Sequence, residues 1–215
     1  PVSAPLREGD QVITGATGIA VLFLRDDTRI AMDPDSRLRI HEYRHDDAKV
    51  RAGRIRLELL RGSAQVTTGE LAKTRPERFV FEAGGQQIRV HGTVFGANTQ
   101  GQFSVRQGRV AVEQGGKSLG ELNAGEMLDL ATGAAPVKTQ GSLPFQAPDP
   151  TRVGINRDQF FGPDPGLQSQ SGPAAAGTYV HVRGGAVILA QGGGDVVLMQ
   201  GETAMAPAGG GVPMK

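Results

Sequence analysis

The sequence contains no cysteine and no tryptophan among its 215 residues. The absence of cysteine excludes disulfide bonds and metal sites built from thiolates. It is compatible with an oxidising compartment but does not require one. Fold and function must therefore be sought in the other residue types.

Long apolar runs are also missing. No run approaches the ~20 apolar residues that a membrane-spanning helix needs. The first residues, Pro1–Leu6, lack the basic and apolar regions of a signal peptide. We therefore expect neither a transmembrane helix nor a signal peptide in the numbered chain, which would also hold for a mature or trimmed form.

Neither sign of charge is in excess. The chain has 23 basic and 22 acidic side chains, for a formal net charge of +1. Such a balance gives no electrostatic case for binding nucleic acid or an anionic membrane. We expect neither as a partner.

Glycine, by contrast, is abundant, with 32 residues, or about 15% of the chain and about twice the usual share. Between the glycines, apolar and polar residues alternate, as Ile55, Leu57 and Leu59 do within Arg54–Arg61. This period of two is typical of a strand with one buried face, and the apolar run Ile19–Leu24 fits a buried strand. The sequence predicts an all-β fold of stacked short strands, solenoid-like or a sandwich, joined by glycine hairpins.

Three connections between predicted strands are interpreted from their turn residues. Arg25–Thr28 predicts a hairpin with a two-residue turn. Residues 71–78 predict a charged loop. Gly116–Ser118 resembles the end of a phosphate loop, but Ala111 stands where that loop needs its first glycine, so we interpret the segment as a hairpin turn.

Composition divides the chain into four parts. We expect an N-terminal arm at residues 1–8, a β domain at 9–141, a linker rich in Pro, Gly and Ser at 142–176, and a C-terminal β tail at 177–215. The linker is longer than most loops of compact domains. The tail is too small to fold alone, so its strands must dock on its own body or on a neighbouring molecule.

The tail repeats the end of the β domain. Residues 105–116 match residues 182–193, and after a one-residue gap residues 122–126 match residues 198–202. Residues 60–66 are a fainter third copy. Repetition of a strand–turn–strand unit is typical of stacked sheets.

Several segments of the β domain follow an order found in a known protein family. They are Val12–Gly15, Asp26–Thr28, Asp35–Leu38, Ile55–Ala64, Val66–Gly69 with Ala72 and Lys73, Val90–Phe95, Val105–Val112 and Leu122–Glu126. This order resembles a FecR domain over about residues 9 to 130. Two positions depart from the family pattern: Asp27 stands where glycine is usual, and His91 stands where arginine is usual.

The resemblance implies a non-catalytic, extracytoplasmic module in the cell envelope of Gram-negative bacteria, either periplasmic or at the cell surface or secreted. Well-known members relay iron–siderophore signals from an outer-membrane transporter to a sigma factor. They do so through a cytoplasmic anti-sigma segment and a transmembrane helix. This sequence shows neither, so we do not expect signal relay across the inner membrane from it.

His41–His45 spells the His-Glu-x-x-His signature of zinc proteases. The signature requires a helix, which places the two histidines ~6 Å apart along its axis, whereas on a strand they lie ~13 Å apart. The flanking residues alternate as in a strand and Pro34 lies nearby. We therefore interpret His41 and His45 as surface residues near a strand end.

Other residues that carry chemistry elsewhere are given structural interpretations. His91 and His181 fall in predicted strands and are more typical of strand residues than of ligands. Asp33–Asp35 and Asp164–Gly166 lack the spacing of calcium loops and predict turns. The sequence predicts no catalytic, cofactor-binding or metal-ligating residue, and no cofactor.

Three hypotheses follow, in decreasing order of preference. The first is a non-enzymatic envelope module that binds another protein or a surface polymer through sheet edges or hairpin tips. The second is a structural subunit that self-associates through residues 177–215 into a surface fibre or homopolymer. The third is a zinc hydrolase.

Overall fold

The computed structural model describes residues 8–44, 53–130 and 135–152 in full, and within residues 177–207 it describes the backbone of four strands. The predicted arm, apart from Glu8, and residues 153–176 of the predicted linker lie outside the described residues. Asp164–Gly166 lies there too.

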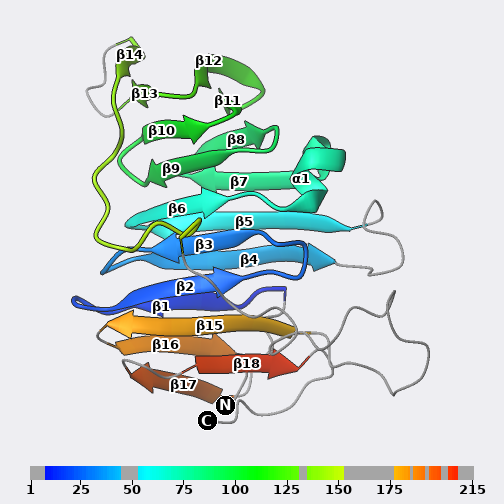
Figure 1. Cartoon of the computed structure of the whole chain (residues 1–215), viewed down its shortest axis with the longest axis vertical. Coiled ribbons are helices and arrows are strands. Elements are labelled where there is room, and N and C mark those ends of the chain that lie inside the picture. Colours follow the sequence, from blue (N-terminus) through cyan, green and yellow to red (C-terminus); the bar gives the residue numbers. More distant parts are fainter. Residues whose placement is uncertain are drawn as a thin grey trace.

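The described chain forms two nine-stranded sheets, stacked strand upon strand (Figure 1). Sheet A contains, in spatial order, β12 (Lys117–Asn123), β11 (Arg109–Gln114), β8 (Gln86–Val90), β7 (Phe79–Ala83), β5 (Arg54–Arg61), β4 (Arg37–Arg44), β1 (Gln11–Thr14), β16 (Ala186–Gln191) and β17 (Gly194–Met199). Sheet B contains β14 (Val137–Gln140), β13 (Glu126–Asp129), β10 (Gln102–Gln107), β9 (Val94–Asn98), β6 (Ser63–Thr67), β3 (Arg29–Met32), β2 (Ile19–Phe23), β15 (Gly177–Gly184) and β18 (Thr203–Pro207). The all-β prediction is confirmed.

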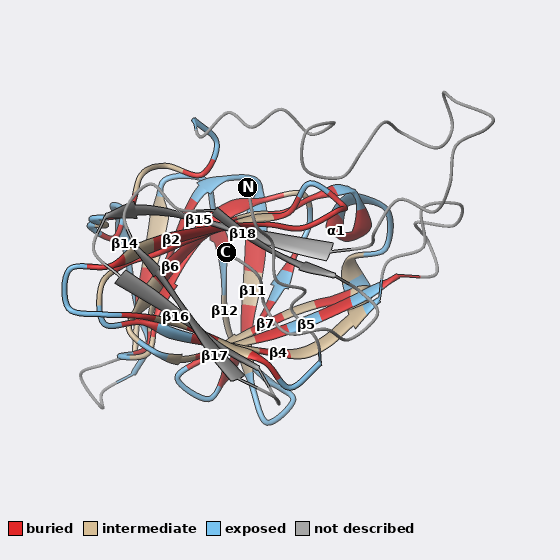
Figure 2. Cartoon of the chain, turned by 90° about the horizontal axis from the view of Figure 1, so that it is seen from below, coloured by how far each residue is buried: buried red, intermediate tan, exposed pale blue. Residues whose placement is uncertain are grey.

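The core lies between the two sheets, whose strands form opposite walls when viewed along the stack (Figure 2). In β5, Ile55, Leu57 and Leu59 are each 1% exposed, as the alternation predicts. Phe81 of sheet A meets Phe95 of sheet B edge to face, with ring centroids 5.5 Å apart. Each sheet thus buries its inner face, and β9 of sheet B is buried on both faces.

The charged loop predicted at residues 71–78 is helical instead. α1 (Glu70–Thr74) and a 3-10 turn at Pro76–Arg78 occupy it, and Leu71 and Ala72 are buried. The reason is topological, because β5 and β7 are parallel neighbours and parallel strands need a crossover connection. The crossover includes β6 and buries two side chains of α1.

The hairpin predicted at Arg25–Thr28 is present, but the two-residue length predicted for its turn is wrong. The last pair of the β2–β3 ladder joins Phe23 to Arg29, so the loop spans residues 24–28. Its backbone closes where Leu24 N–H donates to the Thr28 carbonyl at 2.8 Å. Asp27, at the position where the family pattern has glycine, has a φ of +66°, which aspartate tolerates better than most residues.

The tail docks on the domain of its own chain. β15 pairs with β2 in sheet B, and β16 pairs with β1 in sheet A, both antiparallel. β17 and β18 then continue the two sheets. The tail therefore extends both sheets at the β1–β2 end.

The four tail strands reproduce the arrangement of β10–β13. In both groups the first and fourth strands pair in sheet B, and the second and third pair in sheet A. Phe103 opposes Leu128 in the body, and the matching residue Val180 opposes Ala204 in the tail. The one-residue gap of the sequence repeat has a structural cause: a register shift between β11 and β12 leaves Leu119 unmatched, and β16–β17 has no such shift.

Residues 141–152, which we name the strap, run from β14 along the outer face of sheet B (Figure 1). Leu143 and Ala147 are 8% and 5% exposed. The predicted linker therefore begins with a segment that packs on the domain.

Candidate functional site

A row of polar side chains crosses the outer face of sheet A. Its members lie directly opposite one another on neighbouring strands and are half-buried; we name them the polar row: Arg39, Glu58, Glu82, Gln87 and Glu113. The alternation that buries Leu57 and Phe81 places Glu58 and Glu82 on the opposite face. The row therefore follows from the strand pattern and the register.

Cations on neighbouring positions balance the acids of the polar row. Arg56 Nη2 lies 2.9 Å from Glu82 Oε1, and Arg89 Nε lies 2.8 Å from Glu113 Oε2. Glu58 and Glu82 face each other in register, an arrangement that repels unless it is compensated. The face is thus a network of paired charges.

His41 belongs to this network. The register of β4 against β5 shifts between Ile40 and Glu42, so His41 is the extra residue of a bulge. Its Nε2 lies 2.6 Å from Glu58 Oε2. Bulges commonly re-aim a side chain, and this one brings His41 to the acid on the next strand.

The zinc-protease signature does not have its helical geometry at His41. His41, Glu42, Tyr43 and Arg44 all lie on strand β4, as the alternation predicts. His45 lies outside the described residues. Glu42 instead pairs with Arg44 and Arg54 on the outer face of sheet A, so the helical arrangement that the signature requires is lost.

A different cluster brings together groups that metals use. One ligand atom each from His41, Glu58 and Glu82 lies within 4.8 Å of the others. Arg56 and Gln87 also contact Glu82, each at 2.9 Å. A cation would have to displace these contacts, so the cluster fits an ion-pair network better than a metal site. Sequence spacing could not find it, because it joins strands far apart in the chain.

The other histidines with sequence-based assignments are placed separately. His91 follows the end of β8 and is exposed in a bend, so the prediction that it sits in a strand is wrong. The bend is the connection by which the chain passes from sheet A to sheet B. His181 lies on β15.

The polar row lies inside a region with a family match. Residues 10–116 match the family model described as FecR protein. The chain contains a FecR domain. The match begins just before β1 of the FecR domain and ends in the turn before β12, so the strap and the tail lie outside it.

Solved structures similar to the FecR-domain chain include two crystal structures of a proposed anti-sigma factor from Parabacteroides distasonis ATCC 8503. They share 20% and 18% sequence identity with it, at TM-scores of 0.47 and 0.48. Each match covers 61% of this chain and 60% of the solved chain, so it spans less than two thirds of the solved protein. No curated protein matches. Within the described residues, no helix is both long and apolar enough to cross a membrane.

Proposed function

We propose that the chain is a non-enzymatic protein-binding module of the bacterial cell envelope, periplasmic or at the cell surface, and that it binds its partner through the outer face of sheet A. One observation carries this proposal. The strap covers part of the outer face of sheet B, and the tail occupies the β1 and β2 edges, whereas the polar row keeps its charged groups half-exposed.

The chemistry of the polar row suits a protein partner. Paired charges at a surface add little affinity by themselves, but they set orientation and specificity when a partner brings complementary charges. A surface polymer is a weaker fit, because the row contains no aromatic side chain on which a sugar ring would stack. The FecR domain supports the envelope location and the regulatory or binding role.

Site-specific crosslinking tests the proposal in cells. A photo-reactive residue at position 89, on the sheet A face, should give an adduct with one envelope protein, and Arg56→Glu in the same chain should remove it. The control position is Val137 on β14, which is 44% exposed. An adduct of equal yield at position 137, or none at position 89, would contradict the assigned face.

The alternative is a structural subunit that assembles through its tail. The docking of β15 and β16 relies on strand pairing that a second copy offers equally well. Residues 153–176 have a contour length of roughly 80 Å, long enough to reach a neighbour. Under this alternative, deleting residues 153–215 abolishes self-association measured by light scattering. Under the binding-module proposal, the full-length chain is already a monomer.

A further inference from the structure

Side chains of the domain form hydrogen bonds with the backbone of the strap. The Asp33 carboxylate, 8% exposed, accepts the N–H groups of Gln146 and Ala147 at 3.0 and 2.7 Å. Burial raises the pKa of Asp33, and these two N–H groups oppose the shift. The Asp33 carboxylate is therefore buried, at a cost in solvation, where it accepts hydrogen bonds from two consecutive peptide N–H groups.

Two further buried polar groups of sheet B contact strap backbone. Gln65 Nε2 donates to the Ala147 carbonyl at 3.1 Å, and Ser104 Oγ accepts the Leu143 N–H at 3.2 Å. Gln65 and Ser104 are 6% and 2% exposed. Backbone contacts of this kind recognise the extended form of a peptide more than its sequence.

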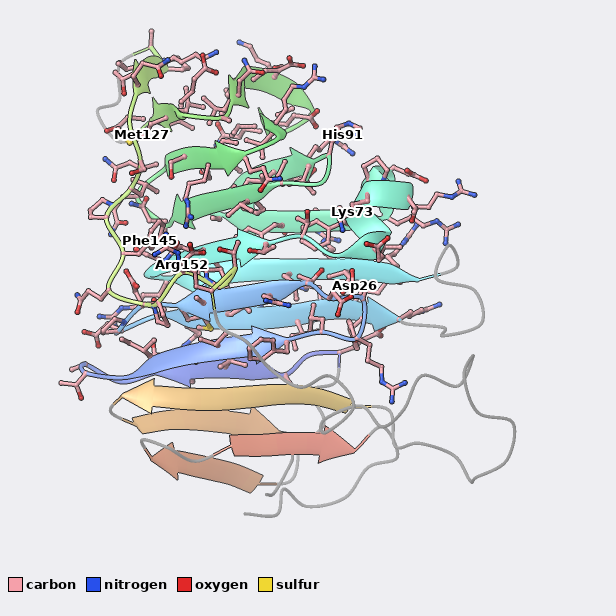
Figure 3. All side chains as sticks on the ribbon, in the orientation of Figure 1. Asp26, Lys73, His91, Met127, Phe145 and Arg152 are labelled. Carbon is pink, nitrogen blue, oxygen red and sulfur yellow. The ribbon has the colours of Figure 1, made fainter. Side chains whose placement is uncertain are left out.

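The absence of a side chain at Gly96 leaves a space, which we name the slot, for one side chain of the strap. The Phe145 ring, labelled in Figure 3, lies where a Cβ on Gly96 would overlap it. Every larger residue at position 96 would close the slot. The strap residue that fills it is aromatic, and its flanking Pro144 restricts the backbone to extended forms.

Two arginines lie at one end of this surface. Arg106 Nη2 lies 2.7 Å from Asp149 Oδ2, and Arg29 Nη1 donates to the Pro150 carbonyl at 3.4 Å. The arginine lowers the pKa of Asp149 to about 2. The surface is therefore complementary to an extended peptide with an acid four residues after its aromatic residue.

We propose that the outer face of sheet B is a peptide-binding groove, formed by Arg29, Asp33, Gln65, Gly96, Ser104 and Arg106, for an extended, proline-flanked segment with a Phe and an Asp at the spacing of Phe145 and Asp149. The strap is its resident ligand. A partner protein brings a segment of the same chemistry and displaces the strap. This inference rests on the proposed function for the nature of the partner.

Charge complementarity is the reason for assigning the groove to a partner segment. Arg106 is partly exposed, with 43% of its side chain accessible, so an incoming acid reaches it without opening the core. The contacts of the strap could also be made by another segment, because they use its backbone groups and the single side chains Phe145 and Asp149. The strap supplies no strand to either sheet, so displacing it breaks no strand pairing.

Peptide binding to a strap-released full chain tests the groove. The probe is a fluorescent synthetic peptide of residues 141–152, and the released chain carries Phe145→Ala with Asp149→Ala, both outside the groove. A tethered strap competes at an effective concentration on the order of millimolar. The released chain should therefore bind the probe about tenfold more tightly than the unmodified chain, measured by fluorescence anisotropy.

Two variants of the strap-released chain test where on the molecule the probe binds. Gly96→Val fills the slot and should weaken probe binding by about tenfold or more, while a circular dichroism spectrum confirms that the sheets remain. Arg89→Glu on sheet A should leave probe affinity unchanged, which separates this inference from the proposed function. Equal affinity of released and unmodified chains, or no effect of Gly96→Val, would overturn the groove.

The source of the segment is tested by light scattering of the unmodified chain. A monomer over the working concentration range is expected if the groove serves a partner protein. A dimer that excess probe dissociates would show that the occupant is the strap of a second copy, and would overturn the assignment to a partner protein.

Discussion

Polar side chains on the outer faces of the two sheets find their partners in different ways. On sheet A, polar side chains of neighbouring strands pair with one another, as Arg56 does with Glu82. On sheet B, buried polar side chains such as Asp33 and Gln65 are satisfied by the strap. A face that satisfies itself remains available to a partner, whereas a face that depends on another segment changes when that segment leaves.

The largest effect expected from this difference is at Asp33. Asp33→Ala removes the acceptor of two strap N–H groups, and we expect a loss of about 1–2 kcal/mol in the free energy of unfolding, measured by urea denaturation. The cost of burying the carboxylate keeps the loss below the upper end for charged hydrogen bonds. Asp33→Asn retains an acceptor oxygen and should recover most of the loss. Equal losses for the two variants would show that acceptance of the strap N–H groups does not stabilise the fold.

Acid should loosen the strap through Asp149. Its pKa is lowered to about 2 in the folded chain, below the ordinary value, so its ionised form stabilises the fold above that ordinary value. This stability is lost as pH falls from about 4 to about 2. Discounted for solvent screening, it is about 1 kcal/mol.

The measurement is the difference in unfolding free energy between the unmodified chain and Asp149→Asn as a function of pH. The difference should shrink as pH falls through this window. A difference that is constant with pH would show that the Arg106–Asp149 pair does not hold the strap.

The smallest effect is expected on sheet A. Glu82→Gln removes one acid of the facing Glu58–Glu82 pair and weakens the contact with Arg56, so repulsion and attraction are lost together. We expect a change of about 0.5 kcal/mol or less in the free energy of unfolding. A loss as large as that of Asp33→Ala would mean that the polar row is structural rather than available for binding.

The two ends of sheet A differ in how their edge strands are protected from further pairing. β12 carries Lys117 and Glu121 and has a register shift, three features that discourage pairing at an edge. At the matching positions β17 has Gly194 and Val197 and no shift. We expect Val197→Lys to lower any self-association of the chain in light scattering, and Glu121→Lys to leave it unchanged.

The sequence was informative where local pattern decides structure. The alternation around Leu57 correctly predicted β5 and its buried face, and the internal repeat correctly predicted strands in the tail. His41 was correctly placed on a strand. These features depend on a period of two or on similarity between segments, both of which can be recognised without knowledge of distant contacts.

Features that depend on distant contacts could not be predicted. Proline-rich residues 143–150 are typical of a linker, and nothing local indicates that Asp33 would hold them. The meeting of His41, Glu58 and Glu82 requires the parallel neighbours β5 and β7, which follow from the crossover and not from composition. The loop at Asp27 is longer than predicted, because the β2–β3 ladder ends at the pair Phe23–Arg29.

Amide hydrogen exchange of the full chain tests the contrast between the two faces most directly. The N–H groups of Gln146 and Ala147 should be protected in the unmodified chain and should exchange at unstructured rates in Asp33→Ala, while the amides of β6 stay protected in both. Rapid exchange of Gln146 and Ala147 in the unmodified chain would contradict the account, because the strap would then not occupy sheet B.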